Sequence, residues 1–474
     1  MKKLLRSFGA VVLMAFLAVS MSACGGGDGN NWFWFPTTPP DAPTGVVAIF
    51  NNSSSATVSW NAVADATSYN VYYAEASGVS KTVHDVMVST DGTSYTFEGA
   101  EQLAVDTTYY FVVTAVKDSK ESVESLEVSA KYTTFAQTDL EGTWNVTLFY
   151  TGIGVPANYF GWLKLNVTLD AAGDATINYY EPSTGVAPPP TVDPDDFKFT
   201  IDENGIVTQT GIYPGNTSHN VMSSNKELII GTDTISGNAP DTFVQVIRIF
   251  QKAPDWGTME ESFSDADLAN KSFVFHVLSS GALQGWAYGA GTIDAGLVST
   301  ISSIFDPTGA GTPPDPETLV IDPTTGVVTS TTDTNFAGVM TLDKNMIIGT
   351  TQDGEGSFQL RVIQLTDPAA PPTFTMGDLA GVYNFSSIFE GTPAQWQYGT
   401  LTINSSGVTS FLTLEDSILG PLVIPPVTLS MNAAGTITQA GDASFHGTMS
   451  ANKELLVSTF TLYEGVYGLS LAAK

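Results

Sequence analysis

The amino-acid sequence predicts an all-β protein built from several domains, and three observations support this prediction. Its apolar residues come in short runs that alternate with polar residues, which is the period of a half-buried strand. Dipeptides that favour tight turns, such as Asn204-Gly205 and Ser406-Gly407, separate these runs. After Phe135 the chain repeats itself three times, with about eight candidate strands and no convincing helix in each unit. We therefore expect several β-domains in a row.

Composition and charge exclude some classes of function. The chain of 474 residues carries 17 basic and 48 acidic residues, and its formal net charge is −31. Binding to nucleic acid depends on basic side chains that neutralise phosphates, so a nucleic-acid partner is not expected. Cys24 is the single cysteine, and the sequence therefore provides neither a disulfide nor a cysteine-rich zinc site.

The first residues have the pattern of a secretion signal. Lys2, Lys3 and Arg6 precede an apolar run from Ala10 to Val19, and Met21-Ser22-Ala23 lead to Cys24. The run is shorter than the ~20 residues that a membrane-spanning helix needs. An ordinary signal peptide with an incidental cysteine is the alternative reading of this pattern.

The position of this cysteine resembles the lipobox of bacterial lipoproteins. The resemblance implies cleavage before Cys24 and acylation of its thiol, so Cys24 is the predicted site of lipid attachment. Cleavage would leave 14 basic and 48 acidic residues, a formal charge of −34. Gly25 stands where an aspartate is associated with retention in the inner membrane, which favours an outer-membrane or surface location.

The cysteine is followed by a glycine-rich stretch, from Gly25 to Asn31, that predicts a flexible tether. The aromatic cluster Trp32-Phe33-Trp34-Phe35 comes next, ahead of Pro36, Pro39 and Pro40. Tryptophan favours the membrane interface, so these rings are candidates for contact with lipid. Packing against a neighbouring domain is the equally open alternative.

The segment 41–134 resembles a fibronectin type III domain. The resemblance rests on Ala56-Thr57-Val58-Ser59-Trp60, on the strand pattern from Ser68 to Tyr73, and on the run from Thr107 to Val116. Trp60 and Tyr109 match the buried tryptophan and the bracing tyrosine of that family. The family implies a seven-stranded β-sandwich. Its function is open, because the fold serves as a spacer, an adhesion surface or an enzyme accessory.

Four sequence anchors recur in the same order in the three later units. Each unit opens on Asp-Leu, continues with an aromatic strand that includes a tryptophan, and then has a strand–turn–strand and a Met-x-x-x-Lys pattern. The anchors are Asp139-Leu140, Asp267-Leu268 and Asp378-Leu379; Trp162, Trp286 and Trp396; Gly205, Gly326 and Gly435 in the turns; and Met222 with Lys226, Met340 with Lys344 and Met449 with Lys453.

Each unit is long enough for a small domain. An eight-stranded antiparallel meander closes naturally into a barrel, which favours barrels or sandwiches. Gly142-Thr143-Trp144 resembles the Gly-x-Trp start of lipocalin-like barrels, although the second unit has Asn270-Lys271-Ser272 there. One β-propeller, to which each unit gives two blades, is the alternative.

These patterns divide the chain into six segments. They are a lipoprotein signal peptide at 1–23, a flexible tether at 24–40, a fibronectin type III-like domain at 41–134, and β-repeat units at 135–254, 255–367 and 368–474.

The sequence provides no recognisable catalytic or metal-binding motif. His219 and His446 lie three residues before Met222 and Met449, where polar residues at strand ends are the plainer interpretation. Asp193, Asp195 and Asp196 cluster in a proline-rich insert, but they lack the Asp-x-Asp-x-Asp-Gly spacing of a calcium loop. We predict no enzyme activity, no catalytic residues, no metal and no cofactor.

The repeated Met and Lys have a structural interpretation. The three methionines are expected to face a core, and the three lysines to lie in tight hairpins. Trp162, Trp286 and Trp396 are candidates for stacking on a flat ligand if they face a barrel mouth, and are core residues if they face inward.

The sequence therefore predicts a binding or scaffold protein of the cell envelope or cell surface, active in adhesion or matrix contact. Its partners would be the membrane, through the N-terminal lipid anchor, and a protein or glycan. Two alternatives remain: a carrier of small apolar or glycan ligands within the β-repeat units, and an accessory module of a secreted hydrolase.

Overall fold

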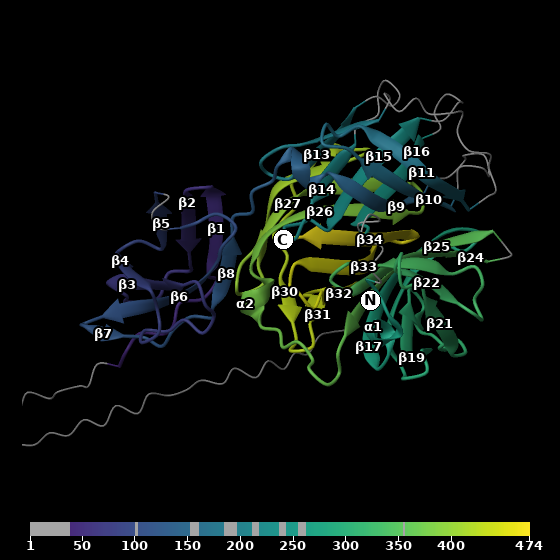
Figure 1. Ribbon diagram of the computed structural model, residues 1–474. Coiled ribbons are helices and arrows are strands. Elements are labelled where there is room, and N and C mark those ends of the chain that lie inside the picture. The colour runs from purple at the N-terminus through teal and green to yellow at the C-terminus, as the bar shows by residue number, and fades with distance from the viewer. Residues whose placement is uncertain are drawn as a thin grey trace, which may run out of the picture. The chain divides into compact units, whose positions relative to one another are not determined.

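The computed structural model describes residues 38–99, 103–151, 161–183, 197–210, 218–236, 243–254, 262–353 and 356–474. Residues 39–474 form one compact unit. The predictions for Cys24, for the tether and its aromatic cluster, and for the acidic insert around Asp193 lie outside the described residues. The described chain consists of strands and turns with only short helices, which confirms the all-β prediction (Figure 1).

The first domain is a sandwich of two antiparallel sheets. The first sheet runs in the order β1 (Val47–Asn52), β2 (Ser55–Ser59) and β5 (Ser94–Glu98). The second contains β4 (Val86–Thr90), β3 (Ser68–Ala74), β6 (Thr108–Lys117), β7 (Lys120–Glu121) and β8 (Val128–Lys131).

Aromatic side chains fill the space between these two sheets. Trp60 is 6% exposed, and its ring centroid lies 5.3 Å from that of Tyr69. The backbone N–H of Ala104 donates a hydrogen bond of 2.9 Å to the buried Tyr109 hydroxyl. Tyr109 therefore holds the chain that precedes β6 against the core, as the resemblance implied.

Each later unit is an eight-stranded up-and-down meander whose last long strand pairs with its first. The first contains the short helix η1 (Gln137–Asp139), then β9 (Gly142–Thr151), β10 (Gly161–Leu169), β11 (Ala175–Pro182), β12 (Lys198–Ile201), β13 (Ile206–Thr210), β14 (His219–Met222), β15 (Leu228–Ser236) and β16 (Phe243–Lys252). The second contains α1 (Asp265–Leu268), β17 (Lys271–Gly281), β18 (Gly285–Ile293), β19 (Val298–Asp306), the extra hairpin strand β20 (Gly309–Ala310), β21 (Glu317–Ile321), β22 (Val327–Ser330), β23 (Ala337–Met340), β24 (Met346–Gln352) and β25 (Ser357–Thr366). The third contains α2 (Met376–Leu379), β26 (Gly381–Glu390), β27 (Gln395–Ile403), β28 (Thr409–Asp416), the extra strand β29 (Gly420–Pro421), β30 (Leu429–Met431), β31 (Thr436–Gln439), β32 (Asp442–Met449), β33 (Leu455–Tyr463) and β34 (Val466–Ala473).

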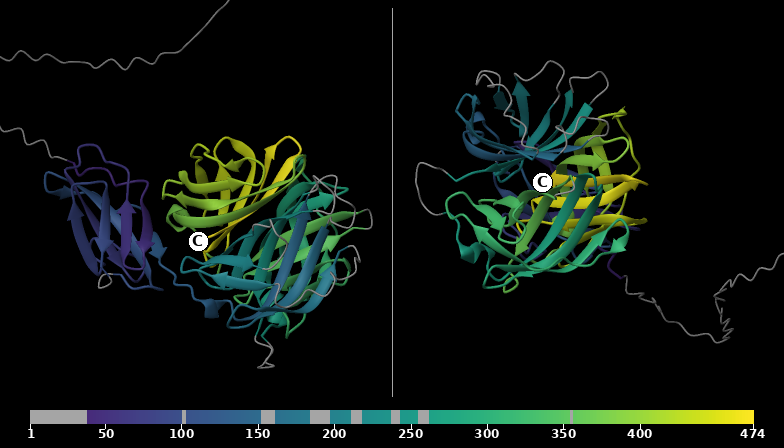
Figure 2. Two further views of the ribbon diagram at one scale, coloured as in Figure 1. Left: turned by 90° about the horizontal axis from the view of Figure 1, so that it is seen from above. Right: turned by 90° about the vertical axis from the view of Figure 1, so that its right-hand side faces the viewer.

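These sheets curl until their two edges meet. In the second unit β19 pairs with both β18 and β21, which closes the ring of strands. Single bridges join Asp174 to Lys198 in the first unit and Val408 to Thr428 in the third. The units are therefore barrels, and the described sheets do not divide into four-stranded propeller blades (Figure 2).

Several barrel strands are buried on both faces. In β15, Ile229 points into the first barrel, whereas Leu228 and Ile230 belong to a second core outside it. In β24, Ile347 points into the second barrel and its neighbours Met346 and Ile348 point out of it, again into that second core. Continuous apolar runs replace strict alternation in these strands, because both faces are covered by protein.

The repeated Lys and Asp anchors pair with one another. Lys226 forms an ion pair of 3.0 Å with Asp139, Lys344 one of 2.9 Å with Asp267, and Lys453 one of 2.8 Å with Asp378. All three lysines lie in hairpin turns at positive φ, and Met222, Met340 and Met449 are buried in the barrel cores, as predicted. The ion pairs attach the opening turn of each barrel to the hairpin between its sixth and seventh strands.

We expect Asp267→Ala to lower the free energy of unfolding by about 1–2 kcal/mol, because Asp267 both caps α1 and pairs with Lys344. Its carboxylate accepts hydrogen bonds of 2.8 Å from the Ser264 N–H and 3.2 Å from the Ser264 hydroxyl. Urea unfolding of residues 39–474 is the measurement. Asp265→Ala is the matched control, because Asp265 is exposed on the same helix; equal effects of the two substitutions would contradict the assigned role.

The first domain contacts the third barrel. Ala380, between α2 and β26, is buried in the core of the first domain. The Ser405 N–H donates a hydrogen bond of 2.8 Å to the Val46 carbonyl. Gly377 approaches the Glu127 backbone so closely that an added Cβ would lie 1.8 Å from that carbonyl oxygen. This contact therefore requires glycine at 377.

Candidate functional site at the junction of the three barrels

The three barrels share a hydrophobic core, which we call the junction core. Most of its members come from equivalent positions in the three units, and nearly all are inaccessible to solvent. They are Phe149, Trp162, Leu228, Ile230, Ile247 and Ile249 from the first barrel, Leu278, Met346, Ile348, Leu360 and Val362 from the second, and Ile388, Trp396, Leu455, Val457, Leu469, Leu471 and Ala473 from the third. The barrels are thus held together by the kind of packing found inside a domain.

Two of the repeated tryptophans reach across this junction to the next barrel. The Trp286 indole N–H donates a hydrogen bond of 2.9 Å to the Thr461 hydroxyl of the third barrel. The Trp396 indole N–H donates one of 2.7 Å to the Thr234 hydroxyl of the first barrel. Thr234 and Thr461 occupy the same position in β15 and β33, so the two contacts are copies of one arrangement.

The predicted stacking residues Trp162, Trp286 and Trp396 are only 6%, 4% and 6% exposed. Protein covers these rings, which favours the core interpretation. A role in stacking on a ligand remains a prediction. Trp162 and Trp396 lie in the junction core, and none of the three rings lines either of the two cavities described below.

The two histidines that precede the Met anchors also lie at the junction. The His219 ring stacks on Tyr398 with centroids 3.8 Å apart and an interplanar angle of 13°. His446 stacks on Tyr288 at 4.0 Å and 16°. Burial lowers the pKa of both histidines, so both are neutral at pH 7 and their rings pack as aromatic surfaces.

The contact between the first and second barrels departs from this pattern. Ala337 stands where the other barrels have histidine, and Lys164 replaces the tyrosine, with its ammonium 4.4 Å from the Trp162 ring centroid. Within the described residues, the Trp162 indole N–H and the Gln352 side-chain oxygen both lack a hydrogen-bond partner. Gln352 occupies the position of Thr234 and Thr461, so this junction lacks the hydrogen bond present in the other two.

We expect Trp286→Phe to lower the free energy of unfolding by about 1–3 kcal/mol, because it removes a buried hydrogen bond and some apolar contact. Trp162→Phe is the matched control, since its indole N–H has no partner among the described residues, and the substitution removes only ring volume and part of the contact with the Lys164 ammonium. Chemical denaturation of both variants measures the difference. An equal cost at the two positions would contradict the importance of the Trp286–Thr461 bond.

His276 is the most deeply buried titratable group of the junction. It is 0% exposed, and its nitrogens lie 2.9 Å from the Thr448 hydroxyl and 3.2 Å from the Thr459 hydroxyl of the third barrel. Burial, with a smaller contribution from His446, lowers the pKa of His276 to about 3. The Thr448 hydroxyl also hydrogen-bonds Gln364, which completes a polar network inside an apolar junction.

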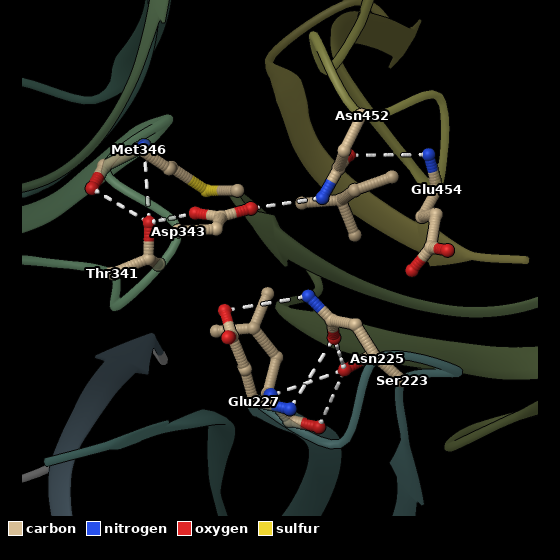
Figure 3. A pocket seen from close by; sticks show the side chains of 10 residues that line it. Ser223, Asn225, Glu227, Thr341, Asp343, Met346, Asn452 and Glu454 are labelled. Carbon is tan, nitrogen blue, oxygen red and sulfur yellow. Dashed lines mark hydrogen bonds between the residues drawn. The ribbon is translucent and has the colours of Figure 1, made fainter.

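The hairpins that carry the repeated lysines meet around one small cavity (Figure 3). It has a volume of about 10 Å³, which is room for about one water molecule, and Glu227, Asp343 and Glu454 line it. Burial and the charges of Asp343 and Glu454 raise the pKa of Glu227. Asn452 donates a hydrogen bond of 2.9 Å to Asp343, which joins the second hairpin to the third.

The hydrogen bonds and the apolar packing of the junction connect the barrels to one another. Within the described ranges, no group of three or more His, Cys, Asp or Glu side chains is arranged to hold a metal ion. No helix among the described residues is long and apolar enough to cross a bilayer. The junction hydrogen bonds join one barrel to the next and fix the barrels relative to one another.

The fold and the junction define a modular all-β protein: one fibronectin type III domain followed by three β-barrels with a shared core. The Fibronectin type III domain family matches residues 41–131, so the chain contains that domain. No curated protein matches the chain.

Three solved structures illustrate the likeness. One titled "Structure of FN3tt mut" is 25% identical, with a TM-score of 0.17, and the match covers 20% of this chain and 97% of that one. A Fn3-like protein from Clostridium thermocellum is 30% identical, with a TM-score of 0.17, and the match covers 21% and 99%. Transferrin binding protein B from serogroup B Neisseria meningitidis is 10% identical, with a TM-score of 0.21, over 90% of this chain and 87% of that one. At these TM-scores the likenesses carry no inference about function.

Proposed function

We propose that this chain is a lipid-anchored binding or scaffold protein of the cell envelope, without enzyme activity. The junction core is the observation that carries the proposal. It joins three barrels through buried apolar packing, and the contact at Ala380 and Ser405 adds the fibronectin domain. A rigid body of this kind is suited to holding binding loops at fixed positions away from a membrane.

Charge supports the same role. The acidic surface favours solubility and disfavours contact with anionic lipid and nucleic acid, so the lipid attachment at Cys24 would supply the link to the membrane. The barrels would then contact a protein or glycan, in adhesion or matrix binding at the outer membrane or cell surface.

The first test is metabolic labelling with radioactive palmitate in a bacterial host, followed by cell fractionation. We expect the wild-type chain to be labelled and membrane-bound, and Cys24→Ser to be unlabelled. Ser22→Ala is the matched control, because it keeps a small residue before the cysteine and should retain the label. Membrane binding of an unlabelled wild-type chain would overturn the proposed lipid anchor.

The second test is protease treatment of intact cells, with the fragments followed by mass. Cleavage of the barrel loops in intact cells is expected for a surface protein that contacts a matrix. Protection until the envelope is opened would contradict the surface location and leave a periplasmic scaffold.

A further inference from the structure

The second barrel contains a cavity of about 470 Å³, within the size range of pockets that bind small molecules. Its wall is largely apolar at one end, where Phe273, Phe275 and Ile363 contribute side chains. Arg361 and Glu317 are among the polar residues that line it. The cavity lies inside the barrel and is separate from the junction core.

The register of β17 and β25 orders these side chains along the cavity. The inward residues pair as Phe273 with Leu365, Phe275 with Ile363, Val277 with Arg361, and Ser279 with Gln359. The wall therefore changes from apolar, at the end near α1, to polar at the other end. The side chain of Arg361 is 24% exposed, so the polar end is accessible to solvent. Such a wall fits a ligand with an apolar body and a polar head.

Two glycines of β18 let the phenylalanine rings of the cavity wall pack closely against the backbone of that strand. At Gly289 an added Cβ would lie 2.7 Å from the Phe275 ring, and at Gly291 it would lie 2.4 Å from the Phe273 ring. The two rings therefore lie close against the backbone of β18. The third barrel has Leu401 at the position of Gly291, which narrows its interior.

The third barrel fills the polar end of the same space. At the position of Ser279 it has Phe389, which is 0% exposed and packs against Phe460 with ring centroids 5.6 Å apart. Opposite Phe389 lies Gly468, at the position of Gln359, and an added Cβ there would lie 2.9 Å from the Phe389 ring. The third barrel therefore fills this end of its interior with aromatic rings, whereas the second barrel has the polar pair Ser279 and Gln359 there.

The charges at the polar end favour a cationic head. Arg361 donates hydrogen bonds of 3.1 and 3.0 Å to Gln359, and its guanidinium lies 3.6 Å from the Asp333 carboxylate. The charges of both Asp333 and Glu317 act on the Arg361 guanidinium. Two carboxylates therefore face one guanidinium at this end of the cavity, which leaves an excess negative charge there. Within the described part of the chain the Glu317 side chain itself has neither a hydrogen bond nor an ion pair.

We infer that the cavity of the second barrel binds a small amphiphile with an apolar body and a protonated amine, with the amine directed toward Glu317. The apolar body would lie against Phe273, Phe275 and Ile363, away from water. A carboxylate head would meet Asp333 and Glu317 in a protein of strongly negative charge, and is therefore disfavoured. This inference is independent of the proposed envelope anchor.

Calorimetric titration of residues 39–474 at pH 7 tests the inference. The probes are decylamine, decanol and decanoate, below the concentrations at which they aggregate. We expect saturable binding of one decylamine per chain, weaker binding of decanol, and the weakest binding of decanoate. Tighter binding of decanoate than of decylamine, or no saturable binding of decylamine, would overturn the inference.

Two variants place the binding in this cavity. The double variant Ser279→Phe with Gln359→Gly copies the Phe389–Gly468 pair of the third barrel and should remove decylamine binding. Gln359→Gly alone leaves the cavity open but removes the acceptor of two Arg361 hydrogen bonds, so it measures how much of any loss comes from the freed Arg361 rather than from filling the cavity. Wild-type affinity in a folded double variant would place decylamine elsewhere on the acidic surface and overturn the inference.

Glu317→Gln keeps the cavity volume and provides a test that does not depend on filling it. We expect decylamine affinity to fall roughly tenfold, because a charge-assisted hydrogen bond is lost, while decanol affinity is unchanged. Asp315→Asn is the matched control, since it removes the same charge from an exposed position two residues away. An equal loss in both variants would show a general charge effect and contradict the role of Glu317.

Discussion

Phe149→Ala is expected to lower the free energy of unfolding by about 3–5 kcal/mol, the range for removing a buried aromatic ring. Phe149 is 0% exposed and lies in the junction core, although its strand belongs to the first barrel. The loss of stability should therefore extend to all three barrels. Hydrogen exchange by mass spectrometry should show faster exchange in β24 and β33 as well as in β9.

Phe199→Ala is the matched control for this prediction. Phe199 is also a buried aromatic residue, but it lies in the first barrel's own core. Its effect on exchange should be concentrated in β9 to β16. If Phe149→Ala also changed exchange only in those strands, the barrels would be energetically independent, and the junction core would not be the unit of stability that we describe.

The stability of the chain is expected to fall as pH decreases from about 6.5 toward 3, with His276 as a main cause. The folded-state pKa of His276 is about 3, below the ordinary value of 6.5, so the unfolded chain binds the proton more readily in this interval. Above pH 7 His276 is neutral in both the folded and the unfolded chain, so it does not make stability depend on pH there. The His276 contribution approaches roughly 4 kcal/mol at the acid end, at about 1.4 kcal/mol per pKa unit.

His276→Thr isolates this contribution, because the first barrel has Thr147 at the same position. Urea unfolding of both proteins between pH 4 and pH 8 is the measurement. The difference in unfolding free energy should be constant above pH 7 and shift in favour of His276→Thr as pH falls. His219 and His446 are present in both proteins, so their titration largely cancels. Parallel pH curves would contradict the assignment.

The sequence predicted the separate parts of this fold better than their assembly. The fibronectin domain follows from the pattern around Trp60 and Tyr109, and the barrels follow from the strand count and the repeated anchors. Each of these signals is local, since a strand's alternation reports the two faces of that strand. The Lys226–Asp139 pair joins two anchors that the sequence analysis recognised but did not connect.

The junction core is indicated only weakly by the amino-acid sequence. The runs Leu228-Ile229-Ile230 and Met346-Ile347-Ile348 are apolar without a break, which indicates burial on both faces. That signal shows that something covers the outer face but does not show what. Trp286 finds its hydrogen-bond partner 175 residues away, at Thr461 in another barrel, and no spacing rule within one repeat predicts such a contact.

Three of the junction contacts run in one direction around the three barrels. Trp286 of the second barrel donates a hydrogen bond to the third barrel, and Trp396 of the third barrel donates one to the first. Gln251 of the first barrel donates one of 2.8 Å to the Val339 carbonyl of the second. In these three contacts each barrel donates to one neighbour and accepts from the other, as in a cyclic trimer of head-to-tail subunits. The Asn452–Asp343 bond runs in the opposite direction. The three barrels of this one polypeptide are thus arranged like the subunits of a cyclic trimer. A version with one barrel deleted would expose two complementary faces and should assemble with its own copies.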